Sequence, residues 1–130
     1  MASKYFTTSQ KAGIHETTMP LLDAMWIEFK EISKKKPDSA VSSNKVKIVN
    51  RLLVRIRDVL EMDAALAFLD VLDSDDVPQA SDVTLMLSQY VATMVAFKER
   101  HYGWNGEERD WYIADGDDEE GDCVSDVDVD

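Results

Sequence analysis

The chain has 130 residues, of which 45% are hydrophobic, and a formal net charge of −12. This length and composition are typical of one globular domain and exclude a wholly disordered chain. The single cysteine, Cys123, cannot form an intramolecular disulfide, no apolar run is long enough for a transmembrane helix, and the first residues lack the pattern of a signal peptide. We therefore expect a soluble, cytoplasmic protein without membrane association.

Charge is distributed unevenly along the chain. Residues 115–130 hold nine acidic residues and no basic one, which leaves 17 acidic and 14 basic residues in 1–114. Residues 30–57 contain nine basic and two acidic side chains, whereas residues 58–82 contain eight acidic and no basic ones. A solvated surface normally mixes the two signs. The separation therefore indicates either a charged binding face or pairing between neighbouring helices.

The first predicted helix covers about 20–34, where apolar residues recur at a helical spacing: Leu22, Met25, Trp26, Phe29 and Ile32. Residues 7–18 are predicted to form an earlier turn or short helix, joined to the first helix or kinked at Pro20. The cations Lys34, Lys35 and Lys36 suit a helix C-terminus, and Pro37 is predicted to end the helix.

The second predicted helix covers about 44–61 and is capped by Ser42 or Ser43. Its apolar side is formed by Val46, Val49, Leu52, Leu53, Ile56, Val59 and Leu60. The opposite side carries a basic ladder, which we define as Lys47, Arg51 and Arg55, one helical turn apart. A third, shorter helix is predicted over 64–72, followed by a loop at 73–78.

The last predicted helix covers 82–101, with Ser81 as its N-cap, and is apolar on most of its circumference. Such a helix is usually central, so we expect it to be the most buried and to touch both longer helices. Beyond it, Gly103 and Asn105-Gly106 break the pattern, and no β-alternation is visible. The sequence therefore predicts an all-α single-domain bundle of four to five helices over 1–114, followed by a disordered acidic tail over 115–130.

No motif points to an enzyme. The five glycines form no phosphate-binding loop, Glu-x-x-His is absent, and one cysteine with two histidines is too few for a zinc site. The aspartate runs lack the spacing of a calcium-binding loop. We therefore predict no catalytic activity, no cofactor and no metal site, and we expect His15 and His101 to be partly buried or capping residues.

The basic ladder, together with Lys34, Lys35 and Lys36, is the strongest positive signal. Like charges one turn apart destabilise an isolated helix slightly, so they need a compensating reason. One interpretation is that acidic residues of 58–76 neutralise this face from neighbouring helices. The other is an anionic partner, either an acidic protein surface or nucleic acid. The near-neutral charge of 1–114 makes nucleic acid the less favoured of the two.

Two further features each allow more than one interpretation. The acidic tail is either only solvated, or folds onto the basic ladder and screens it, or imitates nucleic acid. The aromatic segment with Trp104, Trp111 and Tyr112 either closes one end of the bundle or, with Arg109, forms an exposed contact patch.

These observations predict a non-enzymatic interaction or regulatory protein that docks on a partner protein through a charged helix face. The first alternative is a nucleic-acid-associated protein that uses the basic ladder and has an autoinhibitory acidic tail. The second alternative is an acidic inhibitor that mimics nucleic acid, which fits the net charge but not the basic segment 30–57.

Overall fold

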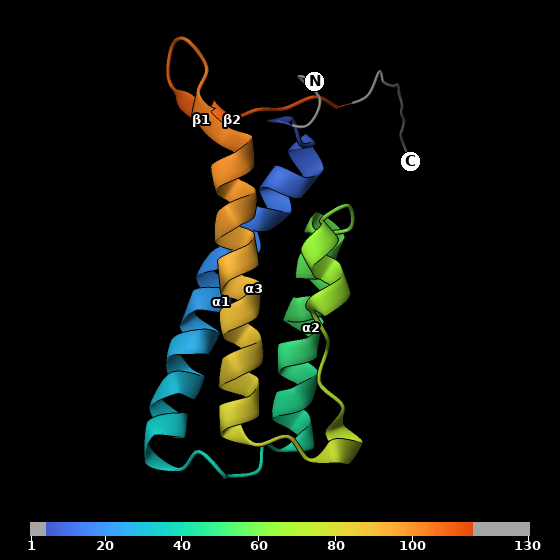
Figure 1. The fold of residues 1–130 in the computed structure, drawn as a ribbon, viewed down its shortest axis with the longest axis vertical. Coiled ribbons are helices and arrows are strands. Elements are labelled where there is room, and N and C mark those ends of the chain that lie inside the picture. The colour runs from blue at the N-terminus through green and yellow to red at the C-terminus, as the bar shows by residue number, and fades with distance from the viewer. Residues whose placement is uncertain (1–4, 116–130) are drawn as a thin grey trace.

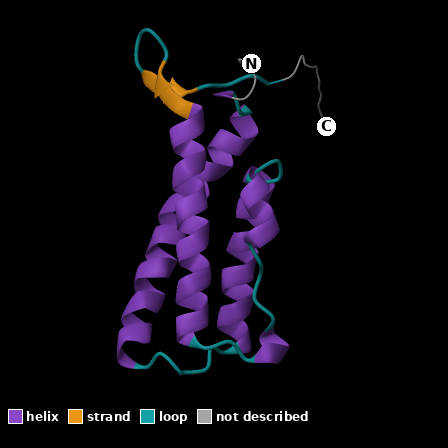
Figure 2. Ribbon diagram, in the orientation of Figure 1, coloured by secondary structure: helices purple, strands orange, loops and turns teal. Residues whose placement is uncertain are grey.

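The computed structural model describes residues 5–115, and within this range it has three α-helices: α1 (Ser9–Lys35), α2 (Ser43–Val59) and α3 (Ala80–His101). Figure 1 shows α1 running opposite to α2 and α3. Figure 2 shows that the fold is mostly helical, with a small sheet at one end. The mostly helical prediction is confirmed, whereas the predicted four to five helices are replaced by three α-helices and two short 3₁₀ helices in the described range. None of the described helices is long and apolar enough to cross a membrane.

α1 is one continuous helix rather than two pieces. It begins at the N-cap Thr8, whose hydroxyl accepts a hydrogen bond from the backbone N–H of Lys11, and it ends at the C-cap Lys36. Pro20 lies inside the helix, and α1 changes direction part-way along its length (Figure 1). A proline lacks the N–H that a helix interior uses, which commonly produces such a bend.

The caps of the other two helices differ in how well they were predicted. The hydroxyl of Ser42 accepts a hydrogen bond from the N–H of Lys45 at 3.2 Å, which confirms the cap of α2. The N-cap of α3 is Gln79 rather than the predicted Ser81. The carboxylate of Asp82 accepts a hydrogen bond from the N–H of Gln79 at 3.1 Å, which completes a reciprocal capping arrangement.

The connecting segment (residues 60–79) returns alongside α2 to the point where α3 begins (Figure 1). It holds the 3₁₀ helices η2 (Ala64–Phe68) and η3 (Ser74–Asp76), so the helix predicted over 64–72 is a shorter 3₁₀ helix followed by extended chain. The backbone after η2 is extended because side chains of other helices take its hydrogen bonds. Arg57 Nη1 donates to the carbonyl oxygen of Leu69 at 2.6 Å, and the hydroxyl of Tyr90 donates to that of Asp70 at 2.8 Å.

The core is formed by residues from all three helices and by the start of the connecting segment. Its largest fully buried side chains are Leu22, Val49, Leu53, Ile56, Val59, Leu60, Val83, Leu87, Tyr90 and Met94. The apolar circumference predicted for this helix is not buried throughout, since Leu85 and Val95 on the other side of α3 are 63% and 44% exposed. In a bundle of three α-helices, α3 has an inner side and a solvent side.

A short hairpin follows α3, contrary to the all-α prediction. β1 (Tyr102–Trp104) pairs antiparallel with β2 (Arg109–Trp111), with Gly103 opposite Asp110. In the turn, the side-chain oxygen of Asn105 accepts hydrogen bonds from the N–H groups of Glu107 and Glu108. Gly106 has a φ of +106°, a conformation that glycine adopts without strain.

The two ends of the described chain meet beside this hairpin. Thr7 and Ile113 form a parallel bridge, in which the N–H of Thr7 donates to the carbonyl of Tyr112 at 2.9 Å and the N–H of Ala114 donates to that of Thr7 at 2.8 Å. The carboxylate of Asp115 accepts hydrogen bonds from both the N–H and the hydroxyl of Ser9, each at 2.7 Å. The first residue of the predicted tail is thus attached to the bundle, and the rest of that tail, from residue 116, lies outside the described residues.

Candidate docking groove

The basic ladder lies on an exposed side of α2. Lys47, Arg51 and Arg55 are all exposed. Arg55 forms an ion pair with Asp58 at 3.0 Å, and both side chains are more than half exposed. Lys47 and Arg51 have no ion pair within residues 5–115. The ladder therefore presents cationic groups to solvent.

Two of the acidic residues predicted to neutralise the ladder pair with other cations instead. Glu61 pairs with Lys11 of α1 at 3.2 Å, and Asp63 pairs with Arg100 of α3 at 2.9 Å. Among the described residues, only Asp58 reaches the ladder. In each of these two pairs one side chain is largely covered, Lys11 in the first and Asp63 in the second. The pairs therefore occupy Glu61 and Asp63 and leave the charge of Lys47 and Arg51 uncompensated by them.

The other predicted cations lie at the C-terminal end of α1. Lys34, Lys35 and Lys36 are exposed, and Lys34 pairs with Glu31 at 3.3 Å within the same helix. They cluster where α1 ends and the loop to α2 begins. These three lysines are therefore at the end of α1, whereas the ladder is on α2.

An apolar groove runs beside the ladder along the seam between α1 and α2. Its central hollow has a volume of about 750 Å³. Leu21 and Met25 of α1 and Ile48 and Leu52 of α2 line it, with Arg51, Arg55 and Glu28 also in the lining. Leu21 and Ile48 are 55% and 43% exposed. Apolar side chains therefore make up most of the lining, which we call the floor, and three charged side chains complete it.

Two smaller hollows extend this groove in both directions. A hollow of about 210 Å³ shares Met25, Phe29 and Ile48 with the central one and adds Lys45. On the other side, a hollow of about 370 Å³ shares Thr18 and Arg55 and extends to Ser9. We call the three hollows together the docking groove, which follows α1 from Ser9 to Ile32.

The course of the connecting segment explains why this seam is open. The segment is bound by Arg57 of α2 and Tyr90 of α3, so it covers the α2 and α3 side of the bundle. No described segment takes the equivalent place over α1 and α2, where Leu21 and Ile48 remain exposed. A bundle of four helices would fill this position with a helix.

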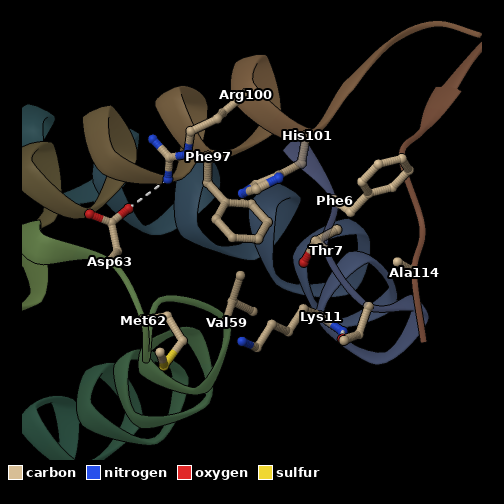
Figure 3. A pocket seen from close by; sticks show the side chains of 11 residues that line it. Phe6, Thr7, Lys11, Val59, Met62, Asp63, Phe97, Arg100, His101 and Ala114 are labelled. Atoms are coloured by element: carbon tan, nitrogen blue, oxygen red, sulfur yellow. Dashed lines mark hydrogen bonds and ion pairs between the residues drawn. The ribbon is translucent and has the colours of Figure 1, made fainter. Parts of the chain in front are cut away.

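A separate hollow, of about 450 Å³, lies outside the docking groove where the ends of the three helices meet, and Figure 3 shows its lining. Its two longest cationic side chains are already paired, Lys11 with Glu61 and Arg100 with Asp63. The third basic residue of the lining, His101, is buried, and its Nδ1 lies 3.0 Å from the carbonyl oxygen of Tyr5. This hollow therefore offers no charged group that lacks a partner among the described residues.

The aromatic segment does not form one contact patch. Trp111 is buried, with its ring 5.2 Å from that of His15, and its Nε1 donates to Glu16 at 2.9 Å. Trp104 is 61% exposed, while Tyr112 is half-buried and donates to the carbonyl of Trp104 at 3.1 Å. Arg109 is exposed beside the ring of Tyr102. Trp111 thus closes one end of the bundle, and its inclusion in an exposed patch was wrong.

Both histidines are buried, as expected. His15 Nε2 lies 2.8 Å from the carbonyl oxygen of Met94, which can only accept, so this nitrogen carries the proton and donates. Burial lowers the pKa of His15 below its usual value of 6.5, since it outweighs the opposing effect of this hydrogen bond. At pH 7 His15 is therefore mostly neutral, and its hydrogen bond to Met94 joins α1 to α3.

Comparison of the chain with models of known families, with curated proteins and with solved structures finds no significant match. For the docking groove, sequence reasoning found the ladder but missed Leu21 and Ile48, which form the exposed part of the groove floor. Leu21 and Ile48 each precede a residue of the apolar stripe of their helix, Leu22 and Val49. These extra apolar residues beside the stripes were the signal in the sequence for an exposed apolar surface.

Proposed function

We propose that this protein is a non-enzymatic docking protein that receives an acidic amphipathic segment of a partner protein in the groove between α1 and α2. The observation that carries the proposal is the combination of exposed apolar residues, Leu21 and Ile48, with the outward-facing cations Arg51 and Arg55 in one hollow. Exposed apolar surface of this kind typically marks an interaction site.

The shape of the groove favours a helical or extended segment over a compact surface. The groove follows α1 over residues 9–32, which corresponds to about 35 Å at 1.5 Å per residue. An amphipathic helix placed there buries its apolar side on the floor, as in other helix-in-groove complexes. The docked segment would thus take the place of a fourth helix.

The charges of the groove favour an acidic partner. Its three hollows are lined by Lys45, Arg51 and Arg55, against Glu28 as the one acidic residue in their lining. Complementary charge accelerates association and disfavours partners of the wrong sign. Both histidines are used within the fold, His15 with Met94 and His101 with Tyr5, which supports a binding role over a catalytic one.

The test measures binding of synthetic fluorescent peptides to the full chain by anisotropy. One amphipathic peptide of about 20 residues carries leucines at helical spacing and flanking glutamates, and a matched peptide has lysines in place of the glutamates. A short double-stranded DNA serves as a third ligand. We expect binding of the acidic peptide alone, weakened by added salt.

Two charge-reversed variants complete the test. Arg51→Glu combined with Arg55→Glu should abolish binding of the acidic peptide, whereas the control Lys98→Glu with Arg109→Glu, which lies outside the groove, should retain it. Equal binding by both variants, or binding of neither peptide, would overturn the proposal. Binding of DNA that only the Arg51 and Arg55 variant loses would instead support the nucleic-acid alternative.

A further inference from the structure

Asp115, the last described residue, is fixed at one end of the docking groove. Its carboxylate is bound by the N–H and the hydroxyl of Ser9. Ser9 also lines the end of the groove, in the same hollow as Thr17 and Arg55. The chain that follows Asp115 therefore starts at the mouth of the groove.

The sequence that follows matches the groove in charge. Residues 116–130, which we call the terminal segment, contain eight acidic residues and no basic one. The cations in the groove lining are Lys45, Arg51 and Arg55. The match thus extends along the α2 side of the groove.

The terminal segment also has an apolar pattern. Its last residues alternate valine and aspartate, with Val127 and Val129 between Asp126, Asp128 and Asp130. In an extended chain, alternate residues point to opposite sides. Such a segment can place both valines on an apolar floor while its aspartates stay in water near a cationic edge.

The length of the terminal segment is sufficient to reach the whole groove. Fifteen extended residues span at most about 50 Å at roughly 3.3 Å per residue. The distance along α1 from Ser9 to Met25, at the central hollow, is about 24 Å at 1.5 Å per residue. Val127 and Val129, 12 and 14 residues beyond Asp115, can therefore lie beside Met25 and Ile48.

We infer that the terminal segment occupies the docking groove of the free protein, with Val127 and Val129 on the floor and its acidic residues along Arg51, Arg55 and Lys45. This inference rests on the proposed function in one respect, because it names the chain's own segment as the competitor of the partner. Attachment at Asp115 makes the binding intramolecular, so a weak interaction is sufficient for substantial occupancy. The apparent affinity for a partner is then lower, in proportion to the fraction of molecules whose groove is free.

The single cysteine of the chain, Cys123, lies within the terminal segment and provides the test. A nitroxide spin label attached to Cys123 of the full chain broadens the NMR signals of nearby methyl groups. We expect loss of the methyl signals of Leu21, Ile48 and Leu52 in the groove. The signals of Leu85 and Val95, on the solvent side of α3, should be retained and serve as internal controls.

Two further measurements decide between binding within one chain and other causes. Arg51→Glu with Arg55→Glu should restore the groove signals, as should about 0.5 M salt, while Lys98→Glu with Arg109→Glu should leave them broadened. Mixing spin-labelled chains with isotope-labelled, untagged chains should leave the groove signals unchanged. Broadening in this mixture would assign the groove to a second copy and overturn the inference, as would undiminished groove signals or equal loss at Leu85 and Val95.

A neutralised terminal segment separates this inference from the proposed function. Asp126→Asn, Asp128→Asn and Asp130→Asn in the full chain should strengthen binding of the acidic peptide several-fold. Peptide binding that the substitutions do not change, together with undiminished groove signals, contradicts the inference and leaves the docking function intact. Spin-label broadening without any peptide binding contradicts the docking function and leaves the inference intact.

Discussion

The side-chain amide of Asn50 forms two hydrogen bonds with the backbone of Leu72: Nδ2 donates to the carbonyl oxygen at 2.7 Å, and Oδ1 accepts from the N–H at 2.9 Å. An adjacent β-strand would offer the same pair of partners. Arg57 and Tyr90 bind the carbonyl groups three and two residues earlier, those of Leu69 and Asp70. The connecting segment is therefore held by side chains from two helices in place of regular structure of its own.

Asn50→Ala should destabilise the domain by about 1–3 kcal/mol, because it leaves two backbone groups of Leu72 without their partner. Urea unfolding followed by circular dichroism measures the loss. Asn44→Ala is the matched control on the same helix, since Asn44 is exposed and makes no side-chain hydrogen bond within the described part of the chain; it should stay within about 0.5 kcal/mol. Similar losses in both variants would contradict the role given to Asn50.

Leu87→Asp should unfold the domain, whereas Leu85→Asp should be tolerated. Leu87 is fully buried, and Leu85, half a turn away on the same helix, is 63% exposed. A carboxylate at position 87 would be buried without a partner, which costs more than about 4 kcal/mol. Thermal melting distinguishes the two variants. A folded Leu87→Asp variant would show that the inner side of α3 is wrongly assigned.

Stability should fall as the pH is lowered through the range just below 6.5. Burial lowers the pKa of His15 in the folded chain below the value of 6.5 expected when unfolded, so the unfolded chain takes up the proton first. The contribution is fully present above pH 6.5 and is lost as the pH falls toward the pKa of the folded state. Melting temperatures measured from pH 8 to 5 test this dependence.

His15→Gln is the control for the pH dependence. Glutamine keeps an N–H that can donate to the carbonyl of Met94 but does not titrate. The fall in melting temperature over the same pH range should be smaller in this variant than in the wild type. Identical pH profiles would show that His15 does not contribute.

Asp115→Ala should lower the melting temperature at neutral pH, because Ser9 then loses the acceptor of its N–H and hydroxyl. These hydrogen bonds lower the pKa of Asp115 below its usual value of 3.8. The stabilisation is therefore present above pH 3.8 and disappears as the pH falls through the lowered pKa. The difference between variant and wild type should close in acid. A difference that persists at pH 2 would point to another cause.

The three long helices were predictable because each has an apolar stripe at helical spacing. The bounds of α2 and α3 were close, as for α2, predicted over 44–61 and observed over Ser43–Val59, whereas α1 begins at Ser9 instead of near residue 20. The connecting segment was not predictable, because the groups that hold its backbone lie 12 to 22 residues away in the sequence. The hairpin was missed since strands of three residues are too short to show an alternating pattern.

The candidate site was predictable only in its charged half. The ladder is visible because like charges one turn apart are unusual on a helix. The apolar half depends on which seam of the bundle remains open, and that follows from where Asn50, Arg57 and Tyr90 hold the connecting segment. Local periodicity does not contain this information, so the exposed positions of Leu21 and Ile48 required the structure.

The parallel bridge between Thr7 and Ile113 has a mechanical consequence. In a parallel pair, a force that separates the two chain ends pulls the strands in opposite directions along their length. The hydrogen bonds of Thr7 with Tyr112 and Ala114 are then loaded together in shear, instead of opening one after another. Stretching the molecule by residues 5 and 115 would therefore break this clamp before the helices unravel.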